Sequence, residues 1–145
     1  MELRVTIENP YHLSVGAVVF DGSKIAIIYK KQQLYTLPRE TIYANESLES
    51  ALSRGMQEEL GVKVEVVKYL GSITRAFSIE NKQIQKTTLY FICNKTDDSR
   101  KSLEQDEEKD LVLWLPVEKA RELLHDDNAD RSNEYRIIDR LKSVT

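Results

Sequence analysis

The clearest amphipathic pattern in the chain spans residues 48 to 60. Apolar side chains recur at helical spacing, at Leu48, Ala51, Leu52, Met56 and Leu60. Asn45 or Ser47 offers a short polar side chain to cap the first turn, and Gly61 is suited to end the helix. We therefore predict one helix with an apolar face and a charged face, the latter carrying Glu49, Arg54, Glu58 and Glu59.

The first third of the chain predicts sheet. Leu13 to Phe20 is a nearly continuous apolar run, Asp21-Gly22 is a strong hairpin turn, and Lys24 to Tyr29 resumes the apolar pattern. Gly16 inside the first run suggests close packing against another backbone.

A second block of strands follows the helix. Val62 to Leu70 and Ile73 to Ile79 are separated by Gly71, which we expect to break the strand. Glu80-Asn81-Lys82 predicts a turn that leads into a strand over Ile84 to Cys93. A further strand is expected at Leu111 to Leu115.

The rest of the chain is a polar stretch followed by helices. Lys95 to Asp110 is rich in acids and predicts a solvated linker. Pro116 precedes a short amphipathic segment, Val117 to His125, with Ala120, Leu123 and Leu124 on its inner face. A last helix is expected over Asp130 to Ser143, with Tyr135, Ile138 and Leu141 turned inward.

Composition narrows the class of protein. A chain of 145 residues is expected to form a single domain, residues 1–145, with its own core. The net charge of −3 argues against a surface for duplex nucleic acid, and no apolar run approaches membrane-spanning length. One cysteine, Cys93, excludes an internal disulfide and is expected in the core, so a reducing cytoplasm is the default location. The oligomeric state is left open.

Two features of the central helix suggest chemistry. Glu58 and Glu59 lie side by side in its last turn, where the helix dipole disfavours carboxylates by roughly 0.3–1 kcal/mol each. A positive partner would relieve that cost. Gly55 lies in the helix interior, where it costs about 1 kcal/mol relative to alanine, so we expect it to permit a close approach or to replace a side chain that is no longer needed.

The spacing over residues 37–62 resembles the Nudix box, G-x5-E-x7-R-E-U-x-E-E-x-G-U with U aliphatic. Without gaps, Glu46, Arg54, Met56, the pair Glu58-Glu59, Gly61 and Val62 match the pattern. Two positions depart from it. Glu40 stands at the opening glycine, within Leu37-Pro38-Arg39-Glu40 where the family usually has LPGG, and Gly55 stands where the family has the glutamate after the arginine.

The resemblance implies a metal centre, Mg²⁺ or Mn²⁺, held by the helix carboxylates matching Glu58 and Glu59. The glutamate missing at position 55 is a further ligand in the family, and the opening glycine lends its carbonyl. We hypothesise that the Glu40 carboxylate, or its carbonyl, occupies the gap left at Gly55. On sequence alone, Gly55→Glu is expected to raise turnover if the site is merely weakened.

The resemblance also implies roles for other residues. Arg54 is expected to orient the helix carboxylates, with Glu46 supporting it. Lys30 and Lys86 are candidate phosphate contacts, although solvated surface charge explains Lys30 and plain sheet packing explains Lys86 equally simply. Arg75 is a third candidate substrate contact. Glu108, with Glu107 as second choice, is the candidate general base from the loop before the strand that carries Trp114.

The sequence as a whole predicts a mixed α/β fold, a Nudix-like α/β/α sandwich with a curved mixed sheet. The implied function is metal-dependent hydrolysis of a nucleoside diphosphate-linked or related pyrophosphate compound. The alternative is a catalytically impaired module that binds a nucleotide or a protein partner without hydrolysis, because one metal ligand is missing. The substrate is not specified by any motif, so nucleoside triphosphates, dinucleoside polyphosphates, nucleotide sugars and inositol pyrophosphates stay open.

Overall fold

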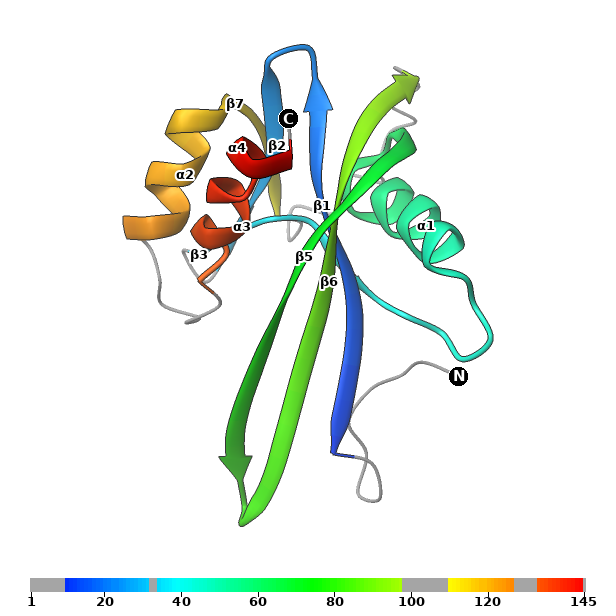
Figure 1. Cartoon of the computed structure of the whole chain (residues 1–145), viewed down its shortest axis with the longest axis vertical. Coiled ribbons are helices and arrows are strands. Elements are labelled where there is room, and N and C mark those ends of the chain that lie inside the picture. The colour runs from blue at the N-terminus through cyan, green and yellow to red at the C-terminus, as the bar shows by residue number, and fades with distance from the viewer. Residues whose placement is uncertain (1–9, 32–33, 98–109, 127–132, 145) are drawn as a thin grey trace.

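The fold is a mixed sheet between one helix and a group of C-terminal helices (Figure 1). The computed structural model describes residues 10–31, 34–97, 110–126 and 133–144. The strands are β1 (Tyr11–Asp21), β2 (Lys24–Lys30), β3 (Leu34–Thr36), β4 (Arg39–Thr41), β5 (Lys63–Ile79), β6 (Lys82–Asp97) and β7 (Leu111–Pro116). The helices are α1 (Leu48–Leu60), α2 (Val117–Asp126), α3 (Tyr135–Asp139) and α4 (Leu141–Val144).

The sheet combines parallel and antiparallel pairs around β1. The strand order is β3-β2-β1-β6-β5, with β4 paired to β1 and β7 paired to β2. β1 runs parallel to β6 over ten residue pairs and antiparallel to β2 and β4. The predicted α/β/α sandwich with a mixed sheet is therefore confirmed.

Alternation along β1 divides the core into two layers. Val15, Ala17 and Val19 face the layer under α1, whereas Val18 faces the layer under the C-terminal helices. This is the period of two that a strand buried on both faces requires. Figure 1 shows the result, with α1 on one side of the sheet and α2, α3 and α4 on the other.

The predicted hairpin turns are confirmed, while the predicted break at Gly71 is wrong. Gly22, at φ 62°, closes the turn between β1 and β2, and Glu80 and Asn81, at φ 48° and 67°, close the turn between β5 and β6. β5 runs through Gly71 as one strand with a register shift there. The Arg140 side chain lies where a Cβ at Gly71 would be, and its Nε donates to the Leu70 carbonyl at 2.8 Å.

Three other sequence expectations need correction. The predicted polar linker starts later, because β6 continues to Asp97, and residues 98–109 lie outside the described part of the chain. The last helix is two short helices, with Arg140 at the junction, and the described chain resumes only at residue 133. The short strands β3 and β4 were not predicted, since three residues are too few to show a period.

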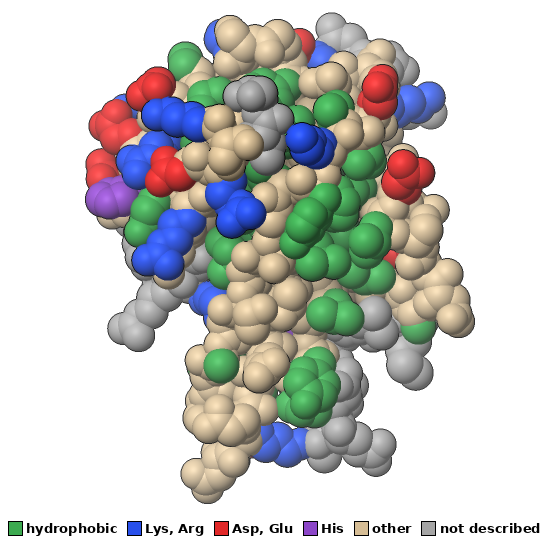
Figure 2. All heavy atoms as spheres, viewed as in Figure 1, with side chains coloured by type: hydrophobic (Ala, Val, Ile, Leu, Met, Phe, Trp, Pro, Cys, Tyr) green, Lys and Arg blue, Asp and Glu red, His purple; other side chains and the backbone are tan. Residues whose placement is uncertain are grey.

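Several apolar side chains stay at the surface. The edge strand β5 leaves Val67 and Tyr69 about half exposed, at 52% and 50%. Figure 2 shows hydrophobic side chains gathered over the upper part of β5 and β6, and basic side chains over the C-terminal helices. Figure 1 shows the turn between β5 and β6 projecting beyond the helices.

Candidate active site

The helix α1 positions the acidic residues of the site. The Ser47 side chain caps it by accepting the Ser50 N–H, and Gly61, at φ 70°, ends it. The predicted apolar face is buried at Ala51, Leu52, Met56 and Leu60, but Leu48 is 39% exposed. Burial of this face fixes the rotation of the helix, so that Arg54 lies away from the core and Glu58 is exposed, whereas Glu59, on the same side as Gly55, lines a cavity with Glu40.

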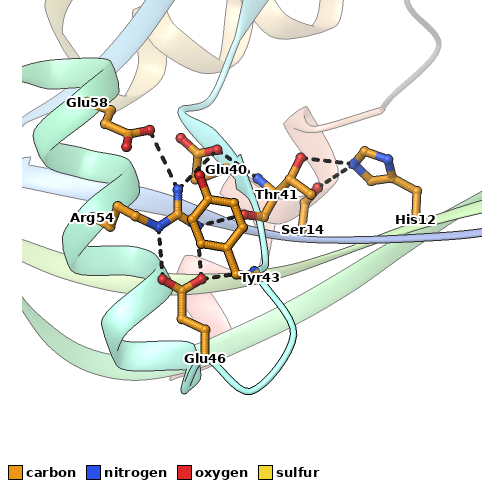
Figure 3. Close-up of polar contacts among 8 residues, drawn as sticks. All are labelled: His12, Ser14, Glu40, Thr41, Tyr43, Glu46, Arg54 and Glu58. Carbon is orange, nitrogen blue, oxygen red and sulfur yellow. Dashed lines mark hydrogen bonds and ion pairs between the residues drawn. The ribbon is translucent and has the colours of Figure 1, made fainter. Parts of the chain in front are cut away.

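Arg54 is the centre of a dense polar network (Figure 3). Its Nε donates to Glu46 Oε2 at 2.8 Å, and its Nη2 donates to Glu46 Oε1 at 2.9 Å and to the Thr41 carbonyl at 2.8 Å. The Tyr43 ring stacks on the guanidinium, 3.9 Å from ring centroid to Cζ. Hydrogen bonding to Arg54 lowers the pKa of Glu46 to about 2, and the same bonds raise the pKa of Arg54. Arg54 and Glu46 therefore form a strong, bidentate ion pair.

The remaining nitrogen of Arg54 faces two other carboxylates. Arg54 Nη1 lies 3.5 Å from Glu40 Oε1 and 3.6 Å from Glu58 Oε2. It is buried without a hydrogen bond of normal geometry. Figure 3 shows Arg54 between Glu46 on one side and Glu40 with Glu58 on the other. Arg54 thus holds two acidic side chains near each other through charge rather than through short hydrogen bonds.

The two departures from the Nudix pattern lie against each other. β4 pairs with β1, with Glu40 opposite Val15, and this places Glu40 against the middle of α1. A Cβ added at Gly55 would lie 2.5 Å from the Glu40 Cβ and 3.0 Å from its Cγ. Glu40 therefore occupies the space that a side chain at position 55 would need, which accounts for the glycine in the helix interior.

Negative charge is concentrated around Glu40. Burial, then a side-chain hydrogen bond to Glu58 and repulsion by Glu58, raise the pKa of Glu40 to about 7. Burial also raises the pKa of Glu59, with repulsion from Asp110 and Glu58 acting in the same direction and attraction to Lys30 and Arg39 opposing it. A divalent cation bound between these carboxylates would relieve this cost.

The acidic side chains do not form a ready-made metal site. Among the described residues, no three Asp, Glu, His or Cys side chains lie at the spacing of metal ligands. The Glu58 side chain is 54% exposed and pairs with Arg54 only at 3.6 Å, so it is able to rotate. Oxygen donors of this kind suit Mg²⁺ or Mn²⁺, and the residues present fit such an ion if the exposed Glu58 side chain, already beside Glu40, moves to face Glu59 as well.

A cavity of about 360 Å³ opens beside these acids. Its wall carries four cationic side chains, together with Glu40 and Glu59. His12 Nε2 lies on the same wall, 3.0 Å from Ser14 Oγ and 3.3 Å from Thr41 Oγ1. The lining residues are His12, Ser14, Lys30, Leu34, Thr36, Arg39, Glu40, Thr41, Glu59, Ile73, Arg75, Lys86, Thr88 and Tyr90.

The structure brings most of the predicted site residues together. Lys30, Arg75 and Lys86 line the cavity with Glu40 and Glu59, although they come from separate strands. Arg54, Glu46 and Glu58 lie directly behind Glu40. Glu108 and Glu107 lie outside the described residues.

Sequence reasoning missed several residues of the site. Arg39 and Thr36 line the cavity, and Glu134 reaches Arg39 from the C-terminal segment. Asp110, from the acidic stretch, acts on the Glu59 carboxylate and accepts the Lys31 N–H at 3.3 Å. Only Arg39 had a signal in the sequence, as a charged residue where the family usually has glycine.

In the described part of the chain, no helix is long and apolar enough to cross a lipid bilayer.

Comparison with known proteins agrees with this architecture. Similar solved structures include a NUDIX hydrolase from Nitrosomonas europaea (TM-score 0.67, 16% identity, covering 91% of this chain and 88% of that chain). A second is a MutT protein from Bacillus halodurans (TM-score 0.63, 19% identity, covering 86% of this chain and 80% of that chain). A third is the E. coli ORF135 protein (TM-score 0.59, 16% identity, covering 92% of this chain and 90% of that chain). No curated protein sequence matches significantly. The NUDIX domain profile matches residues 10–137, and the chain therefore belongs to the NUDIX domain family.

Proposed function

We propose that this chain is a metal-dependent hydrolase that cleaves a phosphoanhydride bond in a nucleoside diphosphate-linked or related pyrophosphate compound. Family membership supports a pyrophosphohydrolase in general terms. The observation that carries the proposal is the contact between Glu40 and Gly55. Relative to the Nudix pattern, the chain lacks a carboxylate at position 55 and has an additional one at position 40, beside the same volume. The number of acidic side chains at this place is therefore the same as in the pattern, which favours a retained metal site.

Glu58, Glu59 and Glu40 would hold Mg²⁺ or Mn²⁺. A bound ion of this kind supplies a nucleophilic water and neutralises charge on the phosphoryl oxygens. Arg54 keeps Glu40 and Glu58 close to each other while Glu46 neutralises the other face of the guanidinium. Arg54 and Glu46 are therefore positioning residues in this proposal.

A base near the metal site would accept the proton of the attacking water. Glu108 is the candidate from the family pattern. Asp110 is a second candidate because it lies close enough to affect the charge of Glu59. Transfer of the phosphoryl group to water would release two phosphorylated products, or one nucleotide and phosphate.

The opposite wall supports a phosphate-rich substrate. Arg75 on β5 lies directly opposite Lys86 on β6 in the antiparallel register, and both line the cavity. Like charges directly opposite on neighbouring strands destabilise a sheet. A phosphate group in the cavity would reduce this repulsion, and Lys30 lines the same cavity, which supports Arg75, Lys86 and Lys30 as substrate contacts.

The rival proposal is a module that binds a nucleotide or a protein partner without turnover. It is favoured by one observation: the described acids do not stand at metal-ligand spacing. The two proposals differ in whether metal binding leads to release of phosphate.

The test combines metal binding with turnover. Manganese binding is measured by electron paramagnetic resonance, and phosphate release is measured with Mg²⁺ or Mn²⁺ on a panel of nucleoside triphosphates, dinucleoside polyphosphates, nucleotide sugars and inositol pyrophosphates. Glu59→Gln should weaken manganese binding and lower turnover by roughly 100-fold or more, because the ion contributes several kcal/mol of charge stabilisation.

Glu118→Gln, at an exposed acid of α2, is the matched control and should change neither quantity. If the chain binds a nucleotide tightly but releases no phosphate at any metal concentration, it is a binding module and not a hydrolase. A wild-type chain that binds no manganese would overturn the metal assignment.

A further inference from the structure

Arg39 is a cation where the Nudix pattern usually has glycine. It belongs to β4, where it lies opposite Gly16 of β1, and its side chain lines the cavity. The side chain is only 26% exposed. An arginine directed into an active-site cavity presents a planar set of donors that matches the oxygens of a phosphate group.

A buried carboxylate restrains Arg39 from behind. Glu134 has no exposed side-chain surface, and its Oε2 lies 3.8 Å from Arg39 Nε. The same carboxylate accepts the Leu37 N–H at 2.9 Å and the Tyr90 hydroxyl at 2.5 Å. A carboxylate without compensating partners would be costly in such a position. Glu134 therefore ties the C-terminal segment to Leu37 and to Arg39 at the start of β4.

The arrangement depends on a space left by Gly16. A Cβ at Gly16 would lie 2.6 Å from the Tyr90 ring, so the glycine admits the ring rather than the backbone that the sequence suggested. Tyr90 is opposite Gly16 in the parallel pair of β1 and β6, and its hydroxyl reaches Glu134 across the sheet. Strands β1 and β6 and the segment before α3 therefore meet beside Arg39.

Thr36 adds an unsatisfied donor on the same wall. Thr36 is 1% exposed, lines the cavity, and its hydroxyl has no hydrogen-bond partner among the described residues. A buried hydroxyl without a partner costs about 1–3 kcal/mol, so its presence requires an explanation. A phosphate oxygen in the cavity would accept this hydrogen bond.

Lys30 and Arg39 share the wall of one cavity with the proposed metal ligand Glu59. A phosphate held by these cations would therefore neighbour the phosphoryl group at the metal. Arg75 and Lys86 supply positive charge on a different part of the wall.

We propose that Arg39, Thr36 and Lys30 form an additional phosphate subsite beside Glu59, and that Glu134 is the positioning residue for Arg39. This inference rests on the proposed function and narrows its substrate class. Four cations from four strands, Lys30, Arg39, Arg75 and Lys86, line the cavity, and this amount of positive charge suits a chain of at least three phosphates better than a lone diphosphate. The substrate class is a compound with a polyphosphate chain.

The experiment measures binding of inorganic tripolyphosphate and of pyrophosphate by calorimetry, in EDTA so that neither metal nor turnover contributes. The wild-type chain should bind tripolyphosphate more tightly than pyrophosphate. Arg39→Gln should weaken tripolyphosphate binding on the order of tenfold or more, as expected for a charged hydrogen bond. Arg39→Lys should recover part of the loss, and Thr36→Val should weaken binding to a smaller extent.

Lys119→Gln is the matched control, because it removes one exposed positive charge from α2, away from the cavity. It should leave tripolyphosphate affinity unchanged. Equal affinity of the wild-type chain and of Arg39→Gln for tripolyphosphate would overturn the subsite, as would undetectable binding to the wild-type chain. If the wild-type chain binds tripolyphosphate but hydrolyses none of the compounds tested, the proposed hydrolase activity is wrong while the phosphate subsite stands.

The role of Glu134 is tested in a double-mutant cycle, since Glu134→Gln keeps an acceptor for the Leu37 N–H but removes the charge that restrains Arg39. Glu134→Gln should weaken tripolyphosphate binding in the wild-type background and have little effect when Arg39 is already glutamine. If Glu134→Gln lowers tripolyphosphate affinity equally with arginine and with glutamine at position 39, Glu134 does not act through Arg39 and its role is structural. Tyr90→Phe, which keeps the ring and removes one donor to Glu134, provides the same comparison if Glu134→Gln does not fold.

Discussion

The cavity has two walls of opposite character. The acidic wall, formed by α1 and β4, carries Glu40 and Glu59, with Glu58 behind Glu40 and one cation, Arg39, on β4. The basic wall, formed by β5 and β6, places Arg75 opposite Lys86. Under the proposed function, a divalent cation would lie against the acidic wall and phosphate oxygens against the basic wall, so one metal-bound phosphate compound would contact both.

The walls also differ in how the backbone supports them. The acidic wall depends on a close fit, because Glu40 fills the volume above Gly55 and Arg54 lies between three carboxylates. The basic wall depends only on strand register, and its side chains are long. Substitutions should therefore disturb the acidic wall through packing and charge together, but the basic wall mainly through charge.

The largest effect is expected at Gly55. Gly55→Glu, expected on sequence alone to raise turnover if the site is merely weakened, meets a steric obstacle in this structure. Its Cβ would overlap the Glu40 Cβ, which cannot move without the backbone of β4. Gly55→Glu should lower the free energy of unfolding by about 1–3 kcal/mol and reduce manganese binding. The exchange variant Glu40→Gly/Gly55→Glu should recover the free energy of unfolding, measured by thermal unfolding, and the manganese affinity, measured by titration.

Ser53→Glu is the control for this comparison, since it adds a carboxylate to an exposed position of the same helix. It should be well tolerated. If the single variant Gly55→Glu were as stable as the wild-type chain and bound manganese more tightly, the idea of one shared volume would be wrong.

A smaller effect is expected at Glu46, which supports the acidic wall. Its pKa is lowered to about 2 from 4.5, mainly by the hydrogen bonds from Arg54. A lowered carboxyl pKa gives stability that is complete above pH 4.5 and is lost as the pH falls toward 2. Glu46→Gln should therefore destabilise the chain by about 2 kcal/mol near neutral pH, and the difference from wild type should shrink across that range.

Urea unfolding at a series of pH values measures this difference. Glu49→Gln, at an exposed acid in the first turn of the same helix, is the control and should show no comparable pH dependence. A Glu46→Gln difference that stays constant down to pH 2 would argue that the ion pair with Arg54 contributes little.

The smallest effect is expected on the basic wall. Lys86→Gln should raise KM for the hydrolysed compound about tenfold and leave kcat nearly unchanged, because it removes one charged contact that is present in both ground and transition states. Lys82→Gln, at the far end of the hairpin, is the control. A change confined to kcat would instead place Lys86 at the reacting group.

The sequence predicted the local elements well where side-chain pattern and backbone preference coincide. The helix α1, with Ser47 and Gly61 at its ends, follows from spacing and caps alone. β1, β2, β6 and β7 also follow from apolar runs. β3 and β4 do not follow from the sequence, because a strand of three residues shows no periodicity and forms only through its hydrogen bonds to a neighbouring strand. Gly71 shows the same limit, since a glycine that suggested a break is a position where Arg140 approaches a continuous strand.

The sequence by itself determined the family pattern, the order of the elements and the two positions that depart from the Nudix box. Only the tertiary structure shows that these two departures are in contact, because Glu40 on a strand packs against Gly55 on a helix. The tertiary structure also brought Arg39, Thr36 and Glu134 together from distant segments. Periodicity records which face of an element is buried, but it holds no information on which side chains of different elements share the same space.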